Sequence, residues 1–283
     1  MSPSSTLHRA VDLLQALPAM PKIAHEILSI KLATDRDDEM LLKLVGKDPA
    51  ISAKIIGLAN SPLFGTSRKI MTTHDAAAVL GIKRIKMVAL SFAMISSVSR
   101  NPAGLLNVTH LWQHSMAVAL AMDALSKAMP RKIRPPDEEI YLAGLLHDIG
   151  FLVLDYVDPE LSNRFHVRLA ESGQLGELEA DMLEMNHCEM GALLAEHWNL
   201  SETLIAVLRY HHSSGIAPDA LGQPLIAMTN LAGRLLPTFD KSESAAVCIK
   251  PEEWQALGIA EERAAEVEAA MRKRAEEVVS ALA

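Results

Sequence analysis

YLAGLLHDIG, residues 141–150, is an apolar run that ends in two adjacent polar side chains, His147 and Asp148, and then a glycine. Two prolines followed by the acidic residues at 137–139 predict a helix start with a capping carboxylate and acids in the first turn. We therefore expect the run to be a buried helix. Imidazole and carboxylate together suit a first-row divalent metal.

Small residues accompany this pair. Ala143 lies one helical turn before His147, and Gly144 lies one turn before Asp148. We expect the missing side-chain volume to leave room for a group that approaches the two polar side chains.

Further histidines occur at helix positions that are expected to face inward. His110 and His114 are four residues apart on one face of a helix, and His187 begins another helix. His211 and His212 end a third helix, and His211 lies on the same stripe as its leucines. We therefore predict that these helices converge. The alternative to a metal site is a set of buried histidines that bond to one another and to Asp148.

The order His, His-Asp, His, His-His resembles the HD superfamily of metal-dependent phosphohydrolases, and it is closest to the HD-GYP type. Four segments of the N-terminal half are similar to the HDOD domain, an HD-related output domain of bacterial signalling proteins. They are LPAMP at 17–21, KDPAISAK at 47–54, LANS at 58–61 and VLGI at 79–82. The resemblance covers about residues 14–236 and implies an all-α fold, with a multi-helix HD-like bundle preceded by an N-terminal helical bundle.

The resemblance also implies a site. Its metal-binding residues would be His114, His147, Asp148, His187, His211, His212 and Asn230. In an active enzyme, His147 and Asp148 would also be catalytic. Iron or manganese is expected before zinc, because mixed nitrogen and oxygen sites of higher coordination number suit those metals.

Two positions depart from the enzyme pattern. Asn230 lies in the segment where HD phosphohydrolases place a closing aspartate, and an amide carries no charge to hold a metal or activate water. Phe151 lies where many HD enzymes have a lysine, so a cation that could meet a phosphate is absent from this position.

Composition limits the class of protein. The chain has 283 residues, 49% hydrophobic content and a net charge of -8, which suits a helical protein with a sizeable core and disfavours nucleic acid and anionic lipid as partners. The two cysteines are far apart in sequence and form no disulfide framework, so a reducing cytoplasm is expected. No apolar run reaches the length of a membrane span, and no membrane association is expected.

The predicted organisation has four parts. Residues 1–13 are a flexible lead, 14–101 the N-terminal helical half, 102–236 the histidine-rich HD-like half, and 237–283 two amphipathic helices. The boundary near 101–104 rests on a proline and a glycine that interrupt a long helical pattern.

Two functions stay open at this point. The first is a regulatory HDOD module that binds a signalling protein or a nucleotide without turnover. The second is a metal-dependent phosphohydrolase that acts on a nucleotide or cyclic dinucleotide. The N-terminal half favours the first function, because HDOD domains commonly lose part of the HD constellation.

Overall fold

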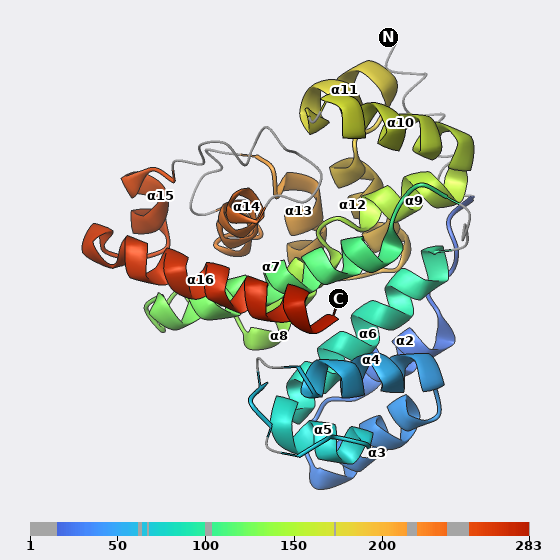
Figure 1. Cartoon of the computed structure of the whole chain (residues 1–283), viewed down its shortest axis with the longest axis vertical. Coiled ribbons are helices and arrows are strands. Elements are labelled where there is room, and N and C mark those ends of the chain that lie inside the picture. Colours follow the sequence, from blue (N-terminus) through green and yellow to red (C-terminus); the bar gives the residue numbers. More distant parts are fainter. Residues whose placement is uncertain are drawn as a thin grey trace.

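The computed structural model describes residues 16–61, 64–66, 68–99, 104–172, 174–213, 220–236 and 249–282. The regular secondary structure in these ranges is helical and includes no strand, which confirms the predicted all-α fold class (Figure 1). The helices are α2 (Lys22–Ser29), α3 (Asp35–Gly46), α4 (Pro49–Ala59), α5 (Thr73–Leu80), α6 (Ile82–Val98), α7 (Val108–Ala128), α8 (Asp137–Leu146), α9 (Ile149–Val157), α10 (Pro159–Ser172), α11 (Leu175–Met182), α12 (His187–His197), α13 (Glu202–Tyr210), α14 (Leu225–Leu235), α15 (Pro251–Ala256) and α16 (Glu261–Leu282).

Local capping explains the helices of the N-terminal half, α2–α6. Thr34 and Asp37 form a capping box at the start of α3, and Asp48 caps α4 with Pro49 in its first turn. Asn60, at the end of α4, accepts a hydrogen bond from the Ile70 N–H at 2.8 Å and donates to the Ile70 carbonyl at 2.8 Å. The Asn60 amide therefore clamps the following loop, and this structural role accounts for its polar group.

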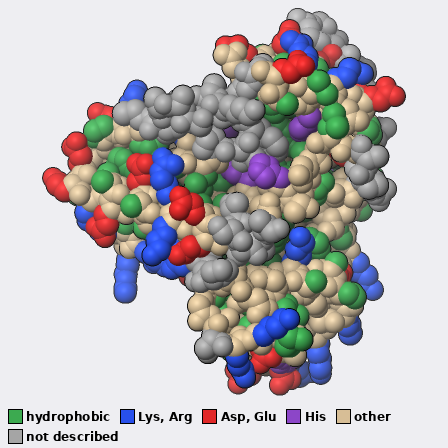
Figure 2. Space-filling model, in the orientation of Figure 1, with side chains coloured by type: hydrophobic (Ala, Val, Ile, Leu, Met, Phe, Trp, Pro, Cys, Tyr) green, Lys and Arg blue, Asp and Glu red, His purple; other side chains and the backbone are tan. Residues whose placement is uncertain are grey.

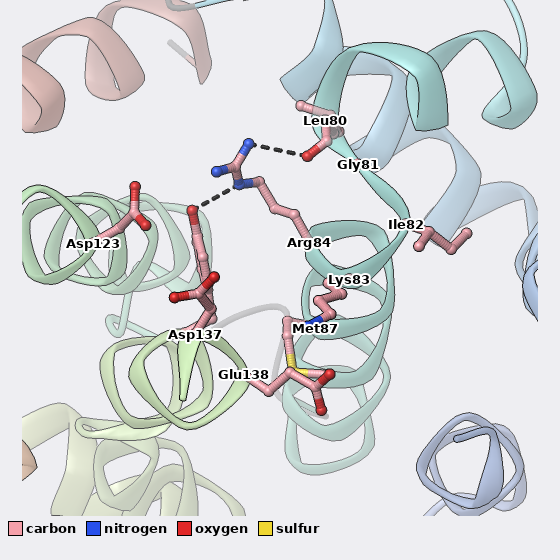
Figure 3. A pocket seen from close by; sticks show the side chains of 10 residues that line it. Leu80, Gly81, Ile82, Lys83, Arg84, Met87, Asp123, Asp137 and Glu138 are labelled. Atoms are coloured by element: carbon pink, nitrogen blue, oxygen red, sulfur yellow. Dashed lines mark hydrogen bonds between the residues drawn. The ribbon is translucent and has the colours of Figure 1, made fainter. Parts of the chain in front are cut away.

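A cavity of about 380 Å³ lies between the start of α6 and the helices α7 and α8 (Figure 3). Arg84 crosses this space, where its Nε donates to the Tyr141 hydroxyl at 2.7 Å and its Nη1 donates to the Leu80 carbonyl at 3.0 Å. The acidic side chains Asp137 and Glu138 also line it. Arg84 thus joins the N-terminal half to α8.

Helix α7 is the centre of the C-terminal half, and the long helix α16 runs along it (Figure 1). The two predicted C-terminal helices are present as α15 and α16, and they cover the core. A Cβ added at Gly144 in α8 would lie 2.5 Å from the Ala119 Cα of α7. The expectation that Gly144 leaves room for a ligand is therefore wrong, because the backbone of α7 takes that space.

The predicted helix through His147 and Asp148 is interrupted at these two residues. His147 is the C-cap of α8, and Asp148 is the N-cap of α9 with φ -98° and ψ 13°. The expected carboxylate cap upstream is also wrong, since Pro136 occupies the N-cap position and makes no side-chain cap. At this break both polar side chains lie beside His114 of α7, and Asp148 also faces the histidines of α12 and of the end of α13.

The apolar core is continuous across the predicted boundary, because one cluster includes buried residues of α2 as well as α16. Residues 100–103, 237–248 and 1–15 lie outside the described ranges, so the flexible lead and the connection after α14 stay predictions. One stretch, Asp137–Val157, is long and apolar enough to cross a membrane by composition, but 83% of it is buried in the protein. This stretch consists of the two buried helices α8 and α9.

Gly150 provides a test of this packing. A Cβ at position 150 would lie 1.8 Å from the His187 carbonyl oxygen, so Gly150→Ala should reduce the free energy of unfolding by about 3 kcal/mol or more through overpacking. Gly57→Ala is the control, because nothing lies within 4 Å of its added Cβ and alanine favours a helix by up to about 1 kcal/mol. Urea denaturation measures both, and similar stability of the two variants would contradict the close approach of α9 and α12.

Candidate metal centre

Four buried histidines and one buried aspartate meet in the interior of the C-terminal half. His114 comes from α7, His147 and Asp148 from the turn between α8 and α9, His187 from the start of α12, and His211 from the end of α13. Each side chain is at most 9% exposed. Figure 2 shows histidine side chains gathered near the centre of one face of the molecule. The predicted convergence of these helices is confirmed.

Asp148 lies between two pairs of imidazoles. Its Oδ2 is 3.2 Å from His147 Nε2 and 3.5 Å from His114 Nε2. Its Oδ1 is 3.6 Å from both His187 Nε2 and His211 Nε2. Within each pair the two Nε2 atoms are 3.3 Å apart. One carboxylate therefore faces two neighbouring sites, in the manner of a ligand that bridges two metal ions.

Hydrogen bonds at the Nδ1 atoms of three histidines determine that this ring nitrogen carries a hydrogen. His147 Nδ1 donates to the Gly144 carbonyl at 2.8 Å, and His211 Nδ1 donates to the Leu208 carbonyl at 2.9 Å. His187 Nδ1 lies 2.6 Å from the Glu179 carboxylate, which also accepts the backbone N–H of His187 at 2.9 Å. Because carbonyl and carboxylate oxygens accept hydrogen bonds, each Nδ1 carries a hydrogen and the Nε2 atom of each ring faces Asp148.

The pair formed by His187 and His211 requires positive charge between its two rings. Neutral His187 and His211 both present lone pairs at Nε2, so these rings cannot bond to each other at 3.3 Å without an added cation. Burial would lower the pKa of His211, but Cys188 and Asp148 raise that pKa to about 9. Without a metal the pair must take up a proton, and a divalent ion supplies the same positive charge.

The other groups have protonation states that suit a metal. Burial lowers the pKa of His114 to about 3, so its ring is neutral near pH 7. Burial would raise the pKa of Asp148, but the neighbouring imidazoles, His147 first, hold it well below its usual range. An ionised carboxylate and a neutral imidazole are the forms that bind divalent ions.

Sequence analysis missed three contributors to this centre. Cys188 Sγ lies 3.5 Å from His187 Nε2 and 3.8 Å from His211 Nε2, and its position directly after His187 was a usable signal. Glu179, 6% exposed, orients His187 from α11, where no spacing rule would have indicated it. Phe151 stacks on the His187 ring with centroids 4.3 Å apart, so the residue in place of a lysine supports a histidine.

Three predicted positions differ from the buried set. His110 and His212 are both exposed, so the expectation that the histidines all face inward is wrong for these two. His212 still borders the centre, with its ring 4.4 Å from the His211 ring. Asn230 Nδ2 donates to the His211 carbonyl at 2.9 Å and thereby holds the end of α13.

A family model for the HDOD domain matches residues 17–214. The chain belongs to the HDOD domain family. The HDOD match includes both the N-terminal half and the histidines from His114 to His212. An uncharacterised protein from Treponema pallidum is 25% identical over 244 residues, which is 84% of this chain and 46% of the relative. This HDOD chain thus spans about half the length of the curated relative that it matches.

Solved structures share the HDOD fold. An HDOD domain protein of unknown function from Geobacter sulfurreducens is 24% identical, with a TM-score of 0.72 and 99% of both chains covered. A candidate signal transduction protein from Marinobacter aquaeolei is 23% identical, with a TM-score of 0.76 over 99% of this chain and 64% of that one. A candidate phosphohydrolase from Shewanella amazonensis is 23% identical, with a TM-score of 0.70, and 97% and 98% covered. At these identities the likeness shows the fold.

The carboxylate of Glu179 provides a test of how His187 is positioned. Glu179→Gln should weaken divalent-metal affinity by about 10–100-fold, as expected when a partner that orients a metal-binding histidine is changed. Glu177→Gln is the control, because Glu177 is an exposed residue of the same helix. Metal titration against a chelating dye measures both, and equal affinity of the two variants would contradict this role of Glu179.

Proposed function

We propose that this chain is a cytoplasmic regulatory HDOD module that binds a divalent metal at its His/Asp centre and transmits a signal by binding a signalling protein or a nucleotide. The observation that carries the proposal is Asp148, a buried carboxylate with two imidazole Nε2 atoms beside each of its oxygens. His114 and Asp148 have pKa shifts that favour the neutral imidazole and the ionised carboxylate, which are the forms that bind a metal.

The residues divide into two groups around Asp148. His114 and His147 would hold one metal with Oδ2, and His187 and His211 would hold a second metal with Oδ1. A bound divalent ion would supply Lewis acidity toward the oxygens of a phosphate group. Exposed His212 borders the second group and is the side chain best placed to meet an arriving ligand.

Two side chains favour binding over hydrolysis. Phe151 is buried and stacked on His187, so this position offers no cation to a transferring phosphoryl group. Asn230 uses its amide N–H on the His211 carbonyl and brings no negative charge to the centre. The site thus keeps groups that bind a metal and lacks two groups that would support turnover.

A metal-dependent phosphohydrolase is the second candidate function. The specific observation in its favour is that His114, His147, Asp148, His187 and His211 are all present and convergent. A nucleotide or a cyclic dinucleotide would be the substrate.

Metal content tests the centre itself. Asp148→Ala removes the only carboxylate that faces both imidazole pairs in the described residues, so bound metal should fall by roughly tenfold or more. Asp181→Ala is the control, because Asp181 is a surface carboxylate paired with Arg168 and such pairs contribute about 0–1 kcal/mol. Elemental analysis after reconstitution with iron, manganese or zinc measures the change. Wild-type protein that retains no metal would contradict the proposal.

Turnover separates the two candidate functions. At matched metal loading, wild type and Asn230→Asp should bind members of a panel of nucleotides and cyclic dinucleotides without hydrolysing them. In Asn230→Asp the new carboxylate replaces a donor to the His211 carbonyl, so the free energy of unfolding should fall by about 1 kcal/mol. Calorimetry and phosphate release are the measurements. Hydrolysis by wild type that disappears in Asp148→Ala, and that rises in Asn230→Asp, would establish the phosphohydrolase instead.

A further inference from the structure

Cys188 is a buried side chain that the pattern of HD histidines does not explain. It is 5% exposed, yet it lies outside the contiguous apolar core. Its Sγ is 3.5 Å from His187 Nε2 and 3.8 Å from His211 Nε2. The thiol therefore faces the two ring nitrogens that also face Asp148 Oδ1.

The distances among these atoms match the edges of a metal coordination tetrahedron. Metal–nitrogen bonds of about 2.0–2.1 Å and a metal–sulfur bond of about 2.3 Å give tetrahedral edges of about 3.3 Å for N···N and about 3.5 Å for N···S. Here the Nε2 atoms of His187 and His211 are 3.3 Å apart, and the sulfur lies 3.5 Å and 3.8 Å from them. Asp148 Oδ1 lies 3.6 Å from both nitrogens and would be the fourth ligand.

The two sides of Asp148 thus differ in chemistry. The side of Oδ2 has His114 and His147, with nitrogen and oxygen donors alone among the described residues grouped there. The side of Oδ1 has the imidazoles of His187, His211 and the exposed His212, and it adds the Cys188 thiol. A thiolate is a soft ligand that favours zinc and tetrahedral geometry, whereas nitrogen and oxygen ligands with open positions also suit manganese and iron(II).

We propose that Cys188 is a thiolate ligand of a tetrahedral metal subsite formed with His187, His211 and Asp148 Oδ1, and that this subsite selects zinc or cobalt(II) over manganese. The assignment rests on the metal centre of the proposed function and deepens it. It revises the sequence-based preference for iron or manganese at this one subsite and leaves that preference in place for His114 and His147.

Cobalt(II) titration of the metal-free reduced protein tests the assignment. In Cys248→Ser the sole cysteine is Cys188, which is itself unaltered. This variant should develop a sulfur-to-cobalt charge-transfer band in the near ultraviolet together with intense visible bands of tetrahedral cobalt(II). Zinc should abolish both signals in competition, and manganese at the same concentration should not.

Cys188→Ser is the matched change at the proposed ligand. It should lose the charge-transfer band and weaken cobalt binding at one subsite by about tenfold or more, while the other subsite still binds. The outcomes separate this assignment from the proposed function. Cobalt binding without a charge-transfer band in Cys248→Ser would overturn the thiolate ligand and leave the metal centre standing. A charge-transfer band that persists in Cys188→Ser would also overturn the assignment of Cys188 as the thiolate ligand. Failure of Cys248→Ser to bind cobalt at all would overturn both the ligand and the metal centre.

Discussion

A buried, ionised carboxylate is the constraint on which the rest of this structure depends. Asp148 is 5% exposed, and a charge removed from water costs several kcal/mol unless positive charge compensates it. Imidazoles from α7, from the ends of α8 and α13 and from the start of α12 surround it, and the raised pKa of His211 allows positive charge there, so helices distant in sequence must meet at one point. The same contacts therefore pack the helices of the C-terminal half and assemble the candidate metal centre.

Close backbone approach makes this meeting possible. Gly144 allows α8 to lie against the backbone of α7 at Ala119, and Gly150 allows α9 to lie against the His187 carbonyl at the start of α12. Any larger residue at either position would separate helices that carry members of the centre. The two glycines thus act on the geometry of the site through packing, without a polar group of their own.

The centre keeps the histidines and the aspartate of the HD pattern, but it departs from that pattern at Phe151 and Asn230. Four imidazoles and Asp148 form the cluster, with outer hydrogen bonds that fix three of the rings. Phe151 and Asn230 use their side chains to support His187 and the end of α13. These two side chains therefore help to hold His187 and His211 in place.

The sequence by itself determined the all-α class and most of the clustered histidines, because apolar periodicity and motif order are local properties. Tertiary structure alone decided that His110 and His212 are exposed, that Glu179 orients His187, and that Cys188 faces two imidazoles. It also ended α8 at His147 and filled the space beside Gly144 with α7. These outcomes depend on contacts between helices that are remote in sequence, and such contacts leave no period or spacing in the chain from which they could be derived.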